Sequence, residues 1–225
     1  MSDSLRVSGR QAIVAKMETT GMVAVIRADG PDQLVDVCKS LAAGGVDVSE
    51  ITMTTPGALK AIEAAADQVG DKCLIGVGSV LDAETARLAI LAGAQYIVSP
   101  TTNLKVIEMA SRYGKPIVCG ALTPTEAITA FQAGADVIKV FPANHFGPKY
   151  FKDLLAPMPQ LKLTPTGGVD LNTAKDWIAA GACCLGVGSA LVKKDLIKGE
   201  KWDELTALAA QFTKAVKDAR TELGK

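Results

Sequence analysis

Residues 133–142, with the sequence AGADVIKVFP, mark a point where a helix is expected to end and a strand to begin. The Ala-Gly pair closes an amphipathic stretch, and the apolar run that starts at Val137 follows almost at once. Glycine just past a helix readily adopts the left-handed conformation that closes the last helical turn. The segment is therefore typical of one αβ unit, in which a helix leads directly into a strand.

The same junction recurs along the chain. Ala-Gly ends an amphipathic stretch, with an apolar segment close behind it, at residues 43–45, 92–94, 133–135 and 180–182. Adding the apolar segments that lack this junction gives eight expected strands, at residues 22–26, 46–51, 73–77, 96–98, 116–119, 137–140, 161–163 and 184–187.

These eight segments recur at intervals of roughly 20 to 27 residues, with helical patterns between them. That spacing is typical of βα units with parallel strands, and eight such units predict a closed (β/α)₈ TIM barrel. The alternative is a doubly wound open sheet, which more usually has about five or six strands.

Helix starts and the two chain ends agree with this division. Asp82 and Asp170 each precede a helical pattern as expected N-caps, and Thr123 is followed by a proline at the first helical position. Residues 11–17 predict an extra N-terminal helix. A C-terminal apolar stripe at helical spacing predicts a helix that covers the barrel, and its members are Trp202, Leu205, Leu208, Phe212 and Val216. No linker interrupts the pattern, so we expect one barrel domain over residues 1–225.

The composition argues against several classes of partner. Of the 225 residues, 48% are hydrophobic, which allows a large core. Lysines and arginines number 24, as do aspartates and glutamates, so the charge balance indicates neither a nucleic-acid nor a membrane partner. No apolar run is long enough for a membrane span, and residues 1–10 are too polar for a signal peptide, so we expect a cytoplasmic protein.

The five cysteines do not form a recognisable framework. They are scattered and odd in number, without a Cys-x-x-Cys pair, and His145 is the one histidine. This pattern argues against a zinc site or disulfides and favours buried thiols in a reducing compartment. His145 follows the 137–140 segment without an evident partner and is interpreted as a loop residue.

Lys139 stands out because it is the one cation in an apolar run. An unpaired ammonium among valines and a phenylalanine is costly to bury, and burial favours the uncharged amine. An uncharged lysine amine is a nucleophile that can form a Schiff base with a ketone. The alternative from this segment alone is an edge-strand lysine whose head lies in water.

In a barrel of parallel strands, the carboxyl ends of all strands meet at one mouth, where the active site forms. The polar residues of this chain follow the expected strands at that end. They are Arg27, Glu50, Thr52, Ser79, Ser99, Lys139, Thr166 and Ser189.

Glycines gather after the last two expected strands. Thr166-Gly167-Gly168 and Gly186-Val187-Gly188-Ser189 allow backbone N–H groups to approach an anion, which predicts a phosphate site. Neither segment extends to Gly-x-Gly-x-x-Gly, so no dinucleotide fingerprint is read. The alternative is that these glycines only make tight turns.

Glu50 alternates with Val46 and Val48 and is expected to point into the barrel with them. A carboxylate there needs a partner, and Lys139 across the barrel is the candidate. Glu50 could then transfer protons, with its pKa raised by the apolar wall. The structural alternative is half of a buried ion pair, although such pairs gather at catalytic sites.

Six segments resemble, in order and approximate spacing, the class I aldolases that act on 2-keto-3-deoxy-6-phosphogluconate (KDPG) and 4-hydroxy-2-oxoglutarate (KHG). The resemblance extends over about residues 22–191, and the segments around Lys139 and at 165–168 are its most specific parts. The six are EIT at 50–52, GVGSV at 76–80, IVSP at 97–100, IKVFPA at 138–143, PTGGV at 165–169 and GVGS at 186–189.

The resemblance implies a homotrimeric (β/α)₈ barrel that needs neither metal nor other cofactor. Lys139 would attack the C2 ketone of the substrate, and Glu50 would act as general acid and base, leaving pyruvate and an aldehyde. Phe141 and Pro100 would wall the pyruvate pocket, while the phosphate would be held by Gly167, Gly168, Gly188 and Ser189, with Thr166 as a further substrate-binding residue.

This chain departs from the family pattern at Thr54, where the best-known members carry an arginine associated with the substrate carboxylate. Threonine donates a hydrogen bond but has no charge. Ser79 could still bind the carboxylate, and Arg27 is our candidate for the missing cation.

Several functions remain open on the sequence. The galactonate-branch aldolases also vary at the position of Thr54, so the sugar epimer is undecided, although the PTGG segment favours the gluconate branch. A phosphate-binding barrel isomerase or synthase would share the glycine loops without needing Lys139 as a nucleophile. A binding or scaffolding relative would keep only the fold.

Overall fold

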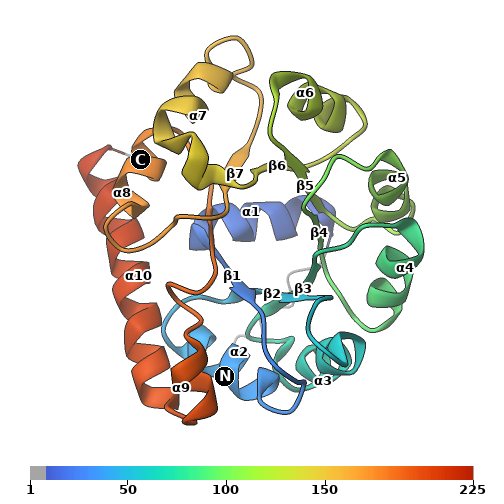
Figure 1. Ribbon diagram of the computed structural model, residues 1–225, viewed down its shortest axis with the longest axis vertical. Coiled ribbons are helices and arrows are strands. Elements are labelled where there is room, and N and C mark those ends of the chain that lie inside the picture. The colour runs from blue at the N-terminus through green and yellow to red at the C-terminus, as the bar shows by residue number, and fades with distance from the viewer. Residues whose placement is uncertain (1–8, 225) are drawn as a thin grey trace.

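The computed structural model describes residues 9–224, which form a barrel of parallel strands surrounded by helices (Figure 1). The expectation that residues 1–10 do not form a signal peptide concerns a stretch that lies mostly outside the described residues. Within residues 9–224, no helix combines the length and apolar character that a membrane span requires.

Eight strands lie in the order β7-β6-β5-β4-β3-β2-β1-β8, and each pairs with its neighbours in parallel. Two isolated parallel bridges, Leu163–Ala182 and Thr166–Gly186, connect β7 to β8 and bring the sheet round on itself. The predicted (β/α)₈ barrel is therefore confirmed, and the open-sheet alternative is wrong. The strands are β1 (Met22–Ile26), β2 (Val48–Thr52), β3 (Leu74–Gly78), β4 (Ile97–Ser99), β5 (Ile117–Ala121), β6 (Val137–Val140), β7 (Leu163–Pro165) and β8 (Leu185–Val187).

The helices form the outer ring, with two additions. The helices between strands are α2 (Leu34–Ala43), α3 (Ala58–Val69), α4 (Ala83–Leu91), α5 (Leu104–Arg112), α6 (Pro124–Gln132), α7 (Gly147–Leu155), preceded by the short 3₁₀ helix η1 (Ala143–His145), and α8 (Ala174–Ala179). After β8 come α9 (Lys194–Lys198) and the long α10 (Trp202–Glu222), which runs along α8 and α2 (Figure 1). The predicted C-terminal stripe is confirmed, since Leu205, Phe212 and Val216 are buried on α10.

The N-terminal helix α1 (Arg10–Thr20) crosses the end of the barrel away from the viewer in Figure 1. Its buried residues Ile13, Val14 and Met17 join a cluster that fills the barrel interior, together with Val23, Val48, Leu74, Tyr96, Val98, Val118, Val137 and Cys184. A second and larger cluster lies between the strands and the outer helices. The two clusters show which side chains point inward on each strand.

This division corrects one detail of the alternation argument. Val48 belongs to the inner cluster, but Val46 precedes β2 and packs in the outer cluster. The strand begins at Val48, so Val46 does not share its alternation. Glu50 nevertheless points inward, as predicted, because it stands two positions after Val48 on the same strand.

Most of the predicted helix ends are found. Gly93, Gly134 and Gly181 have the positive φ of a left-handed helix stop, whereas in the first repeat Gly45 rather than Gly44 takes this conformation. Asp82 caps α4 by accepting a hydrogen bond from the N–H of Thr85, and Thr123 forms a full capping box at α6.

Asp170 is an exception to these caps. Its Oδ1 accepts from the N–H groups of Asn172 and Thr173, so it closes a turn, and α8 begins only at Ala174.

Candidate active site

The barrel brings Lys139 and Glu50 together from opposite walls. Lys139 stands on β6 and Glu50 on β2, and the Nζ of the lysine lies 4.0 Å from Oε1 of the glutamate. Both side chains are almost completely enclosed, with 6% and 3% of their surface exposed. The solvent-facing alternative for Lys139 is therefore wrong.

Glycines on neighbouring strands create the space for this pair. A Cβ at Gly78 on β3 would lie 1.7 Å from Oε1 of Glu50, so only glycine admits the carboxylate there. Gly120 on β5 is the register partner of Lys139, and a Cβ on it would lie 2.1 Å from the backbone of Pro100. The missing side chains at Gly78 and Gly120 leave room for the Glu50 carboxyl and for the backbone of Pro100.

Burial controls the proton affinity of Glu50. The loss of solvation raises the pKa of this carboxyl, and the nearby charges of Lys139 and then Arg27 act in the opposite direction. Its Oε1 has no hydrogen-bond partner among the described residues. A carboxyl with a raised pKa beside an amine is suited to exchanging protons, which is what general acid–base chemistry requires.

An aromatic ring lies at the outer side of the pair. Phe141 follows β6, and its ring centroid is 5.2 Å from Nζ of Lys139. The side chain is partly exposed and also lines a cavity over β7 and β8, whose lining includes neither Lys139 nor Glu50. Phe141 is thus placed between the buried amine and the open mouth.

That cavity, of about 390 Å³, lies over the last two strands and has the size of a small-molecule site. It is lined by the four residues predicted for the phosphate, Gly167, Gly168, Gly188 and Ser189, and by Thr166, predicted to bind substrate. Gly167 and Gly168 have φ of +96° and +72°, and a Cβ on Gly168 would lie 2.6 Å from Cβ of Asn144. Glycine is therefore required at these two positions by the path of the loop.

The residues predicted for the carboxylate are arranged less simply. Thr54 is exposed and its hydroxyl is 2.9 Å from that of Thr52, while Ser79 has a left-handed backbone with φ of 58°. Neither residue lines the cavity over β7 and β8, and Pro100 does not line it either. Arg27 does line it.

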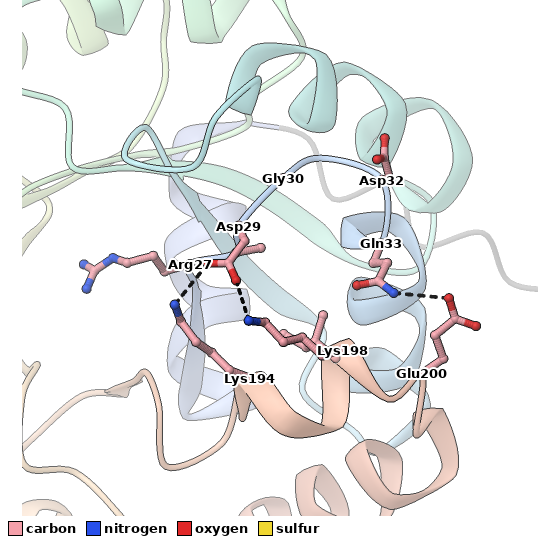
Figure 2. Close-up of a pocket in the computed structure, with 10 residues that line it drawn as sticks. Arg27, Asp29, Gly30, Asp32, Gln33, Lys194, Lys198 and Glu200 are labelled. Carbon is pink, nitrogen blue, oxygen red and sulfur yellow. Dashed lines mark hydrogen bonds and ion pairs between the residues drawn. The ribbon is translucent and has the colours of Figure 1, made fainter.

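Arg27 stands between this cavity and a second one next to it, which lies between the β1–α2 loop and α9 (Figure 2). In the second cavity, Asp29 pairs with Lys194 at 3.1 Å and Lys198 at 3.0 Å, and these two lysines lower the pKa of the aspartate. Figure 2 shows the Arg27 side chain directed away from this ion-pair cluster. Its guanidinium is therefore available to the main cavity.

Sequence reasoning missed Lys194. This lysine lines both cavities, and with Arg27 it supplies a positive charge to the edge of the glycine loops. The sequence does show two consecutive lysines, Lys193 and Lys194, shortly after the Gly-Val-Gly-Ser segment, and this pair could have indicated a cation near the phosphate site. Lys194 is mostly exposed, and its pairing with Asp29 could be seen only in the folded chain.

Other candidate chemistry finds no support in residues 9–224. No group of three or more His, Cys, Asp or Glu residues there could hold a metal ion. All five cysteines carry free thiols, and His145 is exposed on η1.

Comparison with known proteins agrees with this geometry. The family model described as KDPG and KHG aldolase matches residues 13–208. The 2-dehydro-3-deoxy-6-phosphogalactonate aldolase of Escherichia coli is 36% identical over 199 residues, which span 88% of this chain and 95% of that protein. The 2-dehydro-3-deoxy-phosphogluconate aldolase of Haemophilus influenzae is 34% identical over 208 residues, which span 92% and 98%.

A solved structure is similar over nearly the same length. The KDPG aldolase of Legionella pneumophila, with pyruvate captured as a covalent carbinolamine intermediate, superposes with a TM-score of 0.82. The two sequences are 27% identical, and the match covers 88% of this chain and 96% of that one.

Proposed function

Because the chain belongs to the KDPG and KHG aldolase family, we propose that it is a Schiff-base aldolase that cleaves KDPG to pyruvate and glyceraldehyde 3-phosphate. One observation supports this above all: the buried Nζ of Lys139 lies 4.0 Å from a buried carboxyl, and Phe141, whose ring centroid is 5.2 Å from that Nζ, lines the cavity formed by the glycine loops. The same site could cleave KHG to pyruvate and glyoxylate, since only the aldehyde half differs.

The reaction begins with attack of the uncharged Lys139 amine on the C2 ketone, which forms a carbinolamine. Loss of water gives an iminium ion, and this cation is the electron sink for the next step. The carboxylate of Glu50 then takes the proton of the C4 hydroxyl while the C3–C4 bond breaks. The bonding electrons become the enamine, and the C4 hydroxyl becomes the aldehyde.

Pyruvate release reverses the first steps. The protonated Glu50 returns its proton to C3 of the enamine, and water attacks the resulting iminium carbon. The carbinolamine collapses to pyruvate and frees the lysine amine. The protons in this cycle pass between the substrate, the Lys139 nitrogen, solvent and Glu50, and the enclosed position of the carboxyl suits it to the transfers at C3 and C4.

The rest of the site would hold the two charged ends of the substrate. In our proposal, N–H groups around Gly167, Gly168 and Gly188, with the hydroxyls of Thr166 and Ser189, bind the phosphate. Arg27 pairs with the carboxylate beside C2, with help from Ser79 and Thr54. Phe141 and Pro100 wall the pyruvate half.

The galactonate epimer is a second candidate substrate. Thr54 stands where the best-known gluconate enzymes have an arginine, and the relative from Escherichia coli, 36% identical, is named for phosphogalactonate. Both epimers give the same products, because they differ in configuration at C4, where the new aldehyde forms. The choice between them would depend on how the C4 hydroxyl is directed toward Glu50.

Two assays test the function and its alternatives. Borohydride reduction in the presence of pyruvate should add covalent mass to Lys139, whereas a barrel isomerase, a synthase or a binding relative should gain none. Retro-aldol rates for both phosphorylated epimers and KHG, coupled to pyruvate detection, should then identify the substrate. A folded protein that gains no mass and releases no pyruvate would contradict the proposal.

We also propose that the protein is a cytoplasmic homotrimer that works as one barrel domain. Exposed apolar side chains support assembly. Four leucines on or beside α4 and α5 are each more than half exposed, namely Leu81, Leu88, Leu91 and Leu104. Large apolar side chains exposed on two neighbouring helices favour burial against another copy of the chain. Sedimentation analysis should give about three times the chain mass of 23.3 kDa.

A further inference from the structure

Tyr96 places a phenol inside the barrel. The residue is completely buried in the inner cluster, immediately before β4, and its neighbours there are almost all apolar. Three buried side-chain polar atoms lack a hydrogen-bond partner within residues 9–224, namely Glu50 Oε1, Tyr96 Oη and Trp177 Nε1. Trp177 belongs to the outer cluster, so the first two are the pair inside the barrel.

Gly76 lies between the two residues that carry these atoms. Gly76 on β3 is the register partner of Glu50, and the pairing of Val77 with Ile97 sets it beside Tyr96 on its other side. A Cβ on Gly76 would lie 2.3 Å from Cζ and 2.4 Å from both Cε atoms of the Tyr96 ring. The hydroxyl end of the ring therefore extends across β3 toward the strand that carries Glu50.

The carboxylate is held next to it in the same manner. Gly78 stands two positions after Gly76 on the same face of β3, and its missing side chain leaves the space taken by Oε1 of Glu50. The phenol therefore lies over Gly76 and the carboxyl over Gly78, at neighbouring positions on the inner face of β3. Both atoms are buried without a hydrogen-bond partner among residues 9–224, and no direct hydrogen bond joins them, so a connection between them requires a bridging water.

We propose that Tyr96 is a positioning residue for Glu50, and that its hydroxyl donates through one buried water to Oε1 and holds the carboxylate in its ionised, reactive orientation. This inference rests on the proposed function, because it assigns Glu50 the acid–base step. A phenylalanine would fill the same volume, and a phenol left unpaired in an apolar barrel is unfavourable. The hydroxyl is therefore explained by the carboxyl that it faces.

The surrounding charges fix the direction of the hydrogen bond. Burial raises the pKa of Tyr96 well above its usual range, and the charge of Glu50 adds to this effect. The phenol is thus a donor at any working pH. The other titratable groups whose charges act on Tyr96 are the thiols of Cys73, Cys184 and Cys38, whereas those that act on Glu50 are Lys139 and Arg27. A donor to the carboxylate stabilises its charged form, so loss of the hydroxyl should raise the pKa of Glu50 further.

The test uses Tyr96→Phe in the full-length protein with two readouts. The first is ¹³C NMR titration of the Glu50 carboxyl, assigned by the resonance that disappears in Glu50→Gln. The second is the pH dependence of kcat for retro-aldol cleavage. Both the NMR midpoint and the acid limb of kcat should move upward by about one pH unit, while KM changes less than about threefold.

Two control variants separate this effect from simpler ones. Tyr150→Phe removes another phenol, whose hydroxyl donates to the Leu122 carbonyl outside the barrel at 2.7 Å. Val118→Ala loosens the inner cluster without touching a polar group. Neither control should move the NMR midpoint or the acid limb, although Val118→Ala should lower the melting temperature.

Each outcome decides between the two proposals. If wild-type protein traps pyruvate on Lys139 but Tyr96→Phe leaves both titrations unchanged, the positioning role is overturned and the aldolase stands. If the NMR midpoint moves while the acid limb of kcat does not, the positioning role is likewise overturned. If wild-type protein neither traps pyruvate nor cleaves substrate, the aldolase proposal fails, and the NMR titration still decides whether the two side chains are linked.

Discussion

The two ends of the barrel interior are filled by different kinds of residue. At the amino ends of the strands, α1 inserts Ile13, Val14 and Met17 against valines and leucines, and the packing is apolar. At the carboxyl ends, Lys139 and Glu50 face each other, and the nearby Phe141 lines an open cavity over β7 and β8. The difference teaches that one closed sheet can be stabilised at one end and reactive at the other, because a charge is tolerated only where it has a partner and access to substrate.

Replacing Lys139 should have the largest effect on activity. Lys139→Met fills a similar volume but has no amine, so Schiff-base formation should stop and kcat should fall about 10⁴-fold or more. Borohydride trapping with pyruvate, read by intact mass, checks the result, and circular dichroism should show a folded barrel. Residual trapping at another lysine would contradict the assignment of Lys139.

Glu50→Gln should be the next most severe change at the reactive end. The amide keeps the shape but cannot carry a proton, so kcat should fall about 10²- to 10³-fold. Trapping of pyruvate should persist, because Lys139 remains in place. An unchanged kcat would reduce Glu50 to half of a structural ion pair.

Met17→Ala, at the apolar end of the barrel, should affect stability and not activity. Met17 is fully buried, so its truncation should lower the free energy of unfolding by about 2–5 kcal/mol. Chemical denaturation measures this loss, and kcat of the folded protein should change little. A large fall in kcat with intact stability would show that the two ends are not separable.

Arg27→Ala tests the rim of the reactive end. Loss of the guanidinium should raise KM for the keto acid about tenfold while kcat falls less, because a charge-assisted contact to the carboxylate contributes about 1.5 kcal/mol or more. Lys194→Ala is the matched comparison. It should raise KM for phosphorylated substrates and leave KHG unaffected. If Arg27→Ala changed kcat and KM to the same extent, Arg27 would not be a substrate-binding residue.

The pH dependence of stability should show the smallest effect. Burial raises the pKa of Glu50 above its ordinary value of 4.5, so the folded state binds that proton more tightly than the unfolded state does. The stabilising contribution is therefore complete below pH 4.5 and is lost as the pH rises through the folded pKa. Relative to Glu50→Gln, wild-type protein should lose about 1.4 kcal/mol for each unit of the shift. Urea unfolding of both proteins from pH 4 to 8 measures the difference, and parallel stability curves would contradict it.

The elements could be predicted from the sequence because their signals are local. The Ala-Gly junctions, the caps at Asp82 and Thr123, and the α10 stripe each depend on residues within a few positions of one another. The predictions that changed were those that depend on register. Val46 packs outside the barrel because β2 begins only at Val48, and Asp170 closes a turn because α8 starts later.

The sequence by itself determined a barrel of eight βα units with Lys139 on its sixth strand, since hydrophobic period and glycine placement act along the chain. Only the tertiary structure decided that Glu50 meets this lysine at 4.0 Å, and that Tyr96 and Glu50 occupy the spaces left by Gly76 and Gly78. The physical reason is that these contacts cross strands. They depend on the register and closure of the sheet, which no stretch of sequence specifies alone.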